Sequence, residues 1–208
     1  MSIKSLFLTG FLLISQTTFC DQVADQAQFD ECYCLMRRDS DENNVIQHIN
    51  NMSPDVLNMK DRYGFTILHE AVCYNRIAVV DLLLSKMSQK VIDAKDRCRW
   101  TALHWATAYN RTEIVILLIS KMSLDAISVK NDKGGTALYF AVWYENVELV
   151  QLLLSKMSQE AIYAKNNRGF TPLDCAIEQG AKDIADMIRA ARQKKTKNIF
   201  KKWFYKWY

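Results

Sequence analysis

The pair Cys32 and Cys34, with His48 further along the chain, has the residue types of a metal site. A structural zinc ion takes four ligands in a tetrahedron, and no second pair of ligands lies nearby in the sequence. The spacings of the six cysteines match no disulfide framework. We therefore interpret Cys32 and Cys34 as two residues of a helix. A small enzyme with bound metal, and a disulfide from Cys32 to a distant cysteine, are the alternatives.

Two histidines recur in one short context, Thr-x-Leu-His, at His69 and at His104. A histidine can act as a general acid or base when a nucleophile or a carboxylate lies within reach. No such group stands at a helical spacing from His104, and Tyr139 and Asp174 replace the histidine in two later copies. No nucleotide-binding loop or paired carboxylate motif occurs elsewhere. The sequence therefore predicts a protein that is not an enzyme and that uses no cofactor and no metal.

The segments that carry these histidines repeat every 35 residues. The apolar run LLLSKMS at 82–88 returns as LLISKMS at 117–123 and as LLLSKMS at 152–158. The Thr-x-Leu motif keeps the same period and begins at Thr66, Thr101, Thr136 and Thr171. Such self-similarity at a fixed period is typical of a stack of structural repeats.

Each repeat contains the pattern of two short helices. The threonine can cap the first helix by accepting a hydrogen bond from a backbone N–H. The loop between the helices holds Asn75, Asn110 or Gly180, which tolerate a left-handed backbone, and Glu145 is the exception. The second helix carries a Leu, Ile and Val stripe that a single repeat cannot bury, so the next repeat must cover it. We predict an all-α solenoid of stacked helix-turn-helix units.

The motifs Thr-Ile-Leu-His-Glu-Ala at 66–71 and Thr-Ala-Leu-His-Trp-Ala at 101–106 resemble the ankyrin repeat family. The resemblance implies that the histidines bond to backbone and hydroxyl groups and tie neighbouring repeats together. The usual ankyrin period is about 33 residues, and this 35-residue variant looks like ankyrin proteins of obligate intracellular bacteria. The two extra residues follow the second helix, where we expect an added turn of helix.

The resemblance also predicts the division of the chain. A degenerate N-terminal capping repeat occupies 21–60, and the ankyrin repeats occupy 61–192. The individual repeats are expected at about 61–95, 96–130, 131–165 and 166–192. In this family the concave face of the solenoid and the tips of its turns are the usual recognition surface. The resemblance therefore implies a non-enzymatic protein–protein interaction module, which we expect to be a monomer.

Aromatic and basic residues recur at positions that the resemblance places on that surface. Tyr and Trp with Arg are enriched at the hot spots of protein interfaces. The alternative is that the tyrosines pack on neighbouring repeats and only end in solvent. The predicted partner-binding residues are Phe65, Tyr74, Arg97, Trp100, Tyr109, Lys133, Trp143, Tyr144, Arg168 and Phe170.

Residues 1–20 have the layout of a secretory signal peptide, because one lysine precedes a short apolar run that ends before small polar residues. The run is shorter than the roughly 20 residues that a membrane-spanning helix needs. We expect a secreted or exported protein, an effector or adaptor that is a candidate for delivery into a host cell. If the segment is not a signal peptide, the chain is cytoplasmic.

The C-terminal tail, residues 193–208, is basic and aromatic. Six lysines lie in the last 15 residues, so the remainder of a chain of net charge +4 carries about −2, which disfavours nucleic acid as a partner. As a helix the tail would gather its aromatic residues on one face, a pattern suited to a membrane interface. A ligand for a partner helix, a secretion address and a cap on the last repeat are the other interpretations. The residues concerned are Lys201, Lys202, Trp203, Phe204, Lys206 and Trp207.

Overall fold

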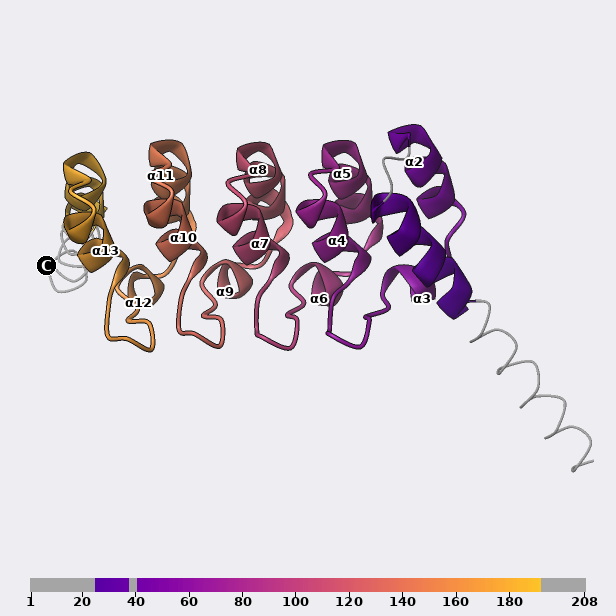
Figure 1. Cartoon of the computed structure of the whole chain (residues 1–208), viewed down its shortest axis with the longest axis horizontal. Helices are drawn as coiled ribbons and strands as arrows, with labels where there is room; N and C mark the ends of the chain where they lie inside the picture. Colours follow the sequence, from indigo (N-terminus) through magenta and orange to yellow (C-terminus); the bar gives the residue numbers. More distant parts are fainter. Residues whose placement is uncertain (1–24, 38–40, 192–208) are drawn as a thin grey trace, which may run out of the picture.

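The computed structural model describes residues 25–37 and 41–191, and in this part of the chain every regular element is a helix. Figure 1 shows the helix pairs standing side by side in the order of the sequence. The prediction of an all-α solenoid of stacked helix pairs is confirmed. The predicted signal peptide (1–20) and the tail (193–208) lie outside the described residues.

Each of the last four units begins with a first helix, namely α4 (Ile67–Cys73), α7 (Ala102–Ala108), α10 (Ala137–Trp143) and α13 (Pro172–Glu178). The second helices are α5 (Ile77–Lys86), α8 (Thr112–Lys121), α11 (Val147–Lys156) and residues 182–191. A short helix lies before each of these first helices, namely α3 (Pro54–Leu57), α6 (Gln89–Ile92), α9 (Leu124–Ile127) and α12 (Gln159–Ile162). Upstream lie a helix over residues 25–37 and α2 (Glu42–Asn50).

The first helices start and stop where the sequence predicts. The Thr66 backbone N–H donates to Nδ1 of His69 (3.2 Å), and Thr171 donates in the same way to Oδ2 of Asp174 (2.8 Å). Each such pair satisfies donors that have no partner within the helix. After the helix the backbone is left-handed, with φ of 56° at Asn75, 55° at Asn110, 51° at Glu145 and 74° at Gly180. Glu145 therefore adopts the same turn as its counterparts, although its side chain does not favour it.

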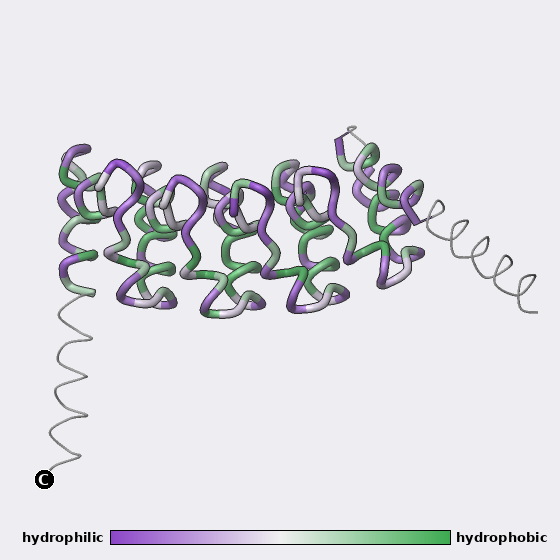
Figure 2. Tube along the Cα trace, turned by 90° about the horizontal axis from the view of Figure 1, so that it is seen from below, coloured by the Kyte–Doolittle hydropathy of each residue, from purple (hydrophilic) through white to green (hydrophobic). Residues whose placement is uncertain are grey.

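The apolar stripe of each second helix is buried between neighbours. Val80, Val115 and Val150 are fully enclosed, and so are Leu83, Leu118 and Leu153 one turn later. α5 packs against α8, and α8 packs against α11. Figure 2 shows the hydrophobic stretches of successive repeats meeting inside the row, with hydrophilic stretches at the loops. Burial between repeats, not within one, is what holds the array together.

The extra residues of the 35-residue period form a separate helix and do not extend the second helix. The backbone at Met87 is extended (ψ 151°), and the following helix α6 has Ser88 as its N-cap. In the next two copies the serine hydroxyl caps the short helix, with Ser123 Oγ accepting from Ala126 N (3.1 Å). Met87, Met122 and Met157 are buried. The expectation of an added turn of helix after the second helix is thus confirmed, and an extended residue at the methionine separates this turn from the second helix.

Gly134 and Gly169 offer a matched test of the turns that precede the first helices. Both are left-handed, with φ of 75° and 85°. A Cβ on Gly134 would lie 2.9 Å from the Asn166 Cα of the next repeat, whereas a Cβ on Gly169 would meet nothing within 4 Å. Gly169→Ala should therefore cost only the left-handed penalty of about 1–2 kcal/mol. Gly134→Ala should cost about 1–3 kcal/mol more, because it adds a clash. Urea denaturation measures both, and equal losses would show that the contact between these turns is unimportant.

Candidate functional site

The turn before each first helix is held rigid by one side chain. Oδ1 of Asp61 accepts hydrogen bonds from the backbone N–H groups of Tyr63 and Phe65 (both 2.8 Å). Asp96 and Asn131 use their side-chain oxygens in the same way, and so does Asn166. The residue before the helix is thus fixed in direction by local hydrogen bonds. In three of the four repeats this residue is aromatic: Phe65, Trp100 and Phe170.

Two of these residues belong to a continuous run of rings across three repeats. The ring of Phe65 lies 5.4 Å from that of Trp105, which lies 4.8 Å from that of Trp100. Trp100 in turn lies 4.8 Å from Phe140 of the next repeat, and Tyr109 stacks on Trp105 at 5.8 Å. We call these five residues the aromatic strip. Such ring pairs stabilise each other beyond simple area burial, so the strip is a preorganised surface.

A buried carboxylate orients the centre of the strip. The Asp96 side chain is almost fully buried, and its Oδ1 accepts from Trp100 N (2.8 Å) while its Oδ2 accepts from Trp105 Nε1 (3.1 Å). One aspartate therefore fixes two tryptophans. At the N-terminal end the position of Trp105 is taken by Glu70, which pairs with Nε of Arg37 at 2.7 Å. The strip ends at Phe65 because α4 carries a carboxylate where α7 carries an indole.

Large aromatic side chains remain in solvent beside the strip. Tyr74, Tyr109 and Tyr144 follow directly after α4, α7 and α10, and 44%, 47% and 49% of their surfaces are exposed. Trp143, at the end of α10, is 55% exposed. About half of the surface of each tyrosine therefore remains in contact with solvent. Equivalent positions in successive repeats present aromatic groups to solvent.

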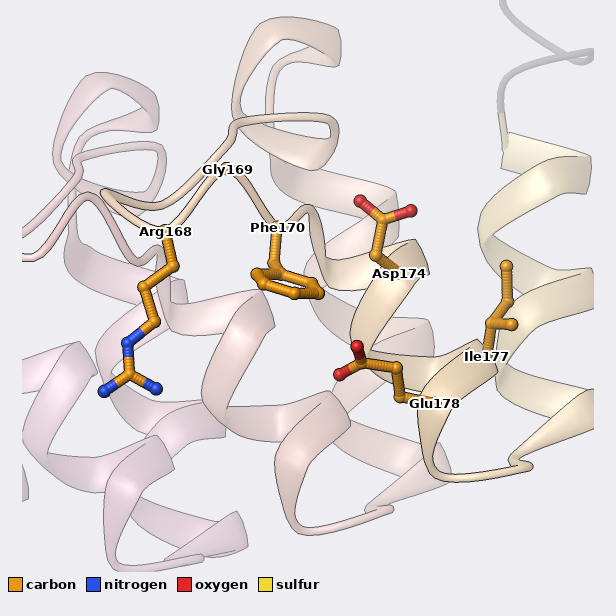
Figure 3. A pocket seen from close by; sticks show the side chains of 6 residues that line it. All are labelled: Arg168, Gly169, Phe170, Asp174, Ile177 and Glu178. Carbon is orange, nitrogen blue, oxygen red and sulfur yellow. The ribbon is translucent and has the colours of Figure 1, made fainter.

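The last repeat adds a shallow pocket. It has a volume of about 320 Å³ and is lined by Arg168, Gly169, Phe170, Asp174, Ile177 and Glu178. Figure 3 shows the Phe170 ring beside Asp174 and Glu178, which project from α13, with Arg168 on the turn at the other side. Hydrogen bonds from Thr171 hold the pKa of Asp174 below its usual value. The pocket is open and mixed in charge, and it prolongs the aromatic surface toward the end of the described chain.

The predicted site residues thus fall into three groups, one of which is exposed outside the aromatic strip and consists of Tyr74, Trp143, Tyr144 and Phe170. Phe65, Trp100 and Tyr109 come together in the aromatic strip, whereas Arg97, Lys133 and Arg168 lie exposed on the turns. Sequence reasoning missed Trp105 and Phe140, which join the predicted residues to one another. Both stand at the variable position of the Thr-x-Leu-His-x-Ala motif, where Glu70 and Cys175 occupy the other copies. The presence of an aromatic residue at this position in two successive repeats could have identified them from the sequence.

The histidines are structural. Both are fully buried, and Nδ1 of each lies 2.9 Å from the hydroxyl oxygen of its threonine. His104 Nε2 also lies 3.3 Å from the Gly135 carbonyl oxygen, which belongs to the next repeat. Burial lowers the pKa of each imidazole to about 4, so both are neutral at pH 7. Both histidines cap helices, and His104 also links its repeat to the next.

Cys32, Cys34 and His48 do not converge. Cys32 is fully buried whereas Cys34 is exposed, and burial raises the pKa of the Cys32 thiol to about 12. His48 Nε2 lies 3.3 Å from the Gln28 carbonyl oxygen. Within residues 25–37 and 41–191 no three His, Cys, Asp or Glu side chains are placed to share a metal ion. In the same part of the chain, no helix is long and apolar enough to span a bilayer.

Comparison with protein families decides the classification. A model of the single ankyrin repeat matches residues 63–97, and a model of three ankyrin repeat copies matches 86–165 and 125–199. The chain belongs to the ankyrin repeat family. Ankyrin repeats indicate a protein–protein interaction module, and the family is generally non-enzymatic. No curated protein matches the sequence.

Proposed function

We propose that this ankyrin repeat protein binds a protein partner through the aromatic strip and the exposed aromatic residues beside it. The observation that carries the proposal is the exposure of Tyr74, Tyr109, Trp143 and Tyr144 at neighbouring positions of three consecutive repeats. Single exposed apolar residues need no explanation, whereas a contiguous patch marks an interaction site. Among these residues Tyr109 belongs to the aromatic strip, where it stacks on Trp105.

The surface has the properties of an interface hot spot. Tyrosine and tryptophan bring a large contact area with few rotatable bonds, so little side-chain entropy is lost on binding. Tyr109 is stacked on Trp105, which Asp96 orients, so its position is fixed before a partner arrives. A preorganised aromatic surface binds more tightly than a mobile one of equal area.

The double variant Tyr109→Ala with Trp143→Ala should weaken partner binding by about 100-fold or more, since two hot-spot residues each contribute about 1–2 kcal/mol or more. Stability should change little, because both side chains are about half exposed. The measurement is the affinity for a partner captured from the source cells, with thermal unfolding of the same samples.

The matched control is the double variant Ile116→Ala with Leu124→Ala, on α8 and α9, whose side chains are similarly exposed. It should leave affinity unchanged. Equal loss in both double variants would contradict the assignment of this face. A large drop in melting temperature for Tyr109→Ala would show that the residue serves packing.

We propose in addition that the chain is exported, because residues 1–20 have a signal peptide layout. An exported ankyrin repeat protein could act as an effector inside a host cell, where a reducing compartment would keep free thiols. N-terminal sequencing of the mature protein tests the first step. Recovery of Met1 on the exported protein would contradict cleavage.

The alternative is a membrane-peripheral adaptor. It rests on the pattern of aromatic residues and lysines in the tail, which would suit an anionic bilayer surface. Co-sedimentation with anionic vesicles, comparing the full chain with a variant that ends at Arg192, separates the two functions. Equal sedimentation would exclude anchoring by the tail.

A further inference from the structure

The turns before the first helices form a basic edge. We call residues 60–64, 95–99, 130–134 and 165–169 the turn row. It contains nine Lys or Arg and three Asp, for a net charge of +6. The other described residues contain nine Lys or Arg and 18 Asp or Glu, for a net charge of −9. The positive charge of the solenoid is therefore concentrated along one edge. Figure 1 shows these turns in a row along the lower margin, each leading into the next first helix.

Backbone hydrogen bonds hold the turns at a fixed step. The Arg97 N–H donates to the Tyr63 carbonyl oxygen (2.9 Å), and the Asp132 N–H donates to the Cys98 carbonyl oxygen (3.0 Å). The Asn167 N–H donates to the Lys133 carbonyl oxygen (2.9 Å) to complete the series. Because every turn is bonded to the next, the charges lie on a rigid ladder whose step is the repeat spacing, about 10 Å.

The positive charges of the turn row form no ion pair in the described part of the chain, although Arg62 lies over the ring of Tyr63. All nine basic side chains are exposed, and none forms an ion pair with another described residue. Two of the three acids are occupied, since Asp61 and Asp96 accept backbone N–H groups within their own turns. Lys60 and Lys130 donate only to backbone carbonyls of the next repeat, at 3.3 and 3.0 Å. An array of like charges is costly to maintain and favours an acidic ligand.

We propose that the turn row binds an extended acidic segment of the protein partner, with acidic residues at about every third position. A polyproline II segment, the extended form in which every third side chain lies on the same side, advances about 3.1 Å per residue, so about three residues span one repeat. Acidic side chains at positions i, i+3, i+6 and i+9 would meet four successive turns. The residues between them would face Phe65, Trp100 and Phe170, which immediately follow the turns. This inference rests on the proposed function, because it names the chemistry of the partner.

Charge density favours a peptide over a nucleic acid. Double-stranded DNA carries one negative charge per about 1.7 Å of helix axis. The turn row offers two or three basic residues per repeat, and the rest of the described solenoid is net negative and would repel a dense polyanion. A segment with one acidic residue per repeat matches the ladder without this repulsion.

The test uses the full chain and two labelled synthetic peptides of about 12 residues, a length that spans four repeats. In the spaced peptide a glutamate stands at every third position between leucine and serine. The clustered peptide has the same composition with its glutamates adjacent. Fluorescence anisotropy should show about tenfold tighter binding of the spaced peptide, weakening as salt is added. Equal affinities, or no binding of the spaced peptide, would overturn the proposal.

Charge-reversal variants locate the contact. Arg97→Glu with Arg168→Glu should weaken binding of the spaced peptide by about tenfold or more. Lys86→Glu with Lys121→Glu, which makes the same charge change on exposed residues at the ends of α5 and α8, should leave binding within about twofold. An equal loss in this control, or a larger loss from Lys201→Glu with Lys202→Glu in the tail, would overturn the assignment. A duplex DNA probe that binds more tightly than the spaced peptide would do the same.

The outcomes distinguish the inference from the function on which it rests. If Tyr109→Ala with Trp143→Ala abolishes binding of the captured partner while the turn-row reversals leave it intact, the proposed function stands and the acidic segment is wrong. If neither pair of variants changes partner binding, both proposals fail.

Discussion

Leu118→Ala is expected to lower the free energy of unfolding by about 2–5 kcal/mol. The Leu118 side chain is completely buried on α8, which packs against α5 on one side and α11 on the other. Truncation leaves a cavity where repeats meet, and a rigid stack of helices can close it only in part. Urea denaturation followed by circular dichroism gives the loss directly.

Ile116→Ala is the matched control, because Ile116 lies on the same helix with 46% of its surface exposed. It should change the free energy of unfolding by no more than about 0.5 kcal/mol. Similar losses in the two variants would mean that the burial between repeats does not determine stability, contrary to the stacking described above.

Acidification from about pH 6.5 to pH 4 is expected to destabilise the protein by several kcal/mol. His69 and His104 have folded-state pKa values lowered by burial to about 4, against an ordinary value near 6.5. A histidine with a lowered pKa contributes its full stability above the unfolded-state pKa and loses it as pH falls toward the folded-state pKa. Below pH 6.5 the unfolded chain therefore binds protons that the folded chain excludes.

The double variant His69→Gln with His104→Gln should be less stable at pH 7 but should flatten this pH dependence. Asp174 does not affect this comparison. Because its pKa is lowered, the stability that its carboxylate contributes is lost only below about pH 4. A slope that persists in the double variant would show that other groups control the acid response.

The fold was predictable because stacking repeats the same physical requirement every 35 residues. Each repeat needs a capped first helix, a left-handed turn and an apolar stripe, so Thr66, Asn75 and Leu83 have counterparts along the chain. The added turn of helix after the second helix was expected, whereas the break at the methionine was not, since Ser-Lys-Met-Ser is compatible with a continued helix. The short helix is capped locally by its serine, while the methionine before it is buried and the Ser158 N–H donates to Oγ of Ser128 in the preceding repeat.

The proposed binding surface was predictable only in part, because only some of its residues recur in every repeat. Tyr74, Tyr109 and Tyr144 recur and could be found by alignment of the chain with itself. Trp105 and Phe140 have no counterpart in the flanking repeats, and their roles emerge only from contacts across repeats. The sharing of Asp96 between Trp100 and Trp105 likewise needs three-dimensional proximity. Residues that differ between repeats confer specificity, but a search for sequence repeats does not identify them because they do not recur.

Amide hydrogen exchange of the full chain, with and without its captured partner, tests the proposed binding surface most directly. Amide exchange should become slower on binding at residues 74–76, 109–111 and 144–146 and along the turn row. Exchange on the solvent-facing sides of α5, α8 and α11 should stay the same. Protection confined to those second helices, with exchange unchanged at residues 74–76, 109–111 and 144–146, would contradict the proposed binding surface.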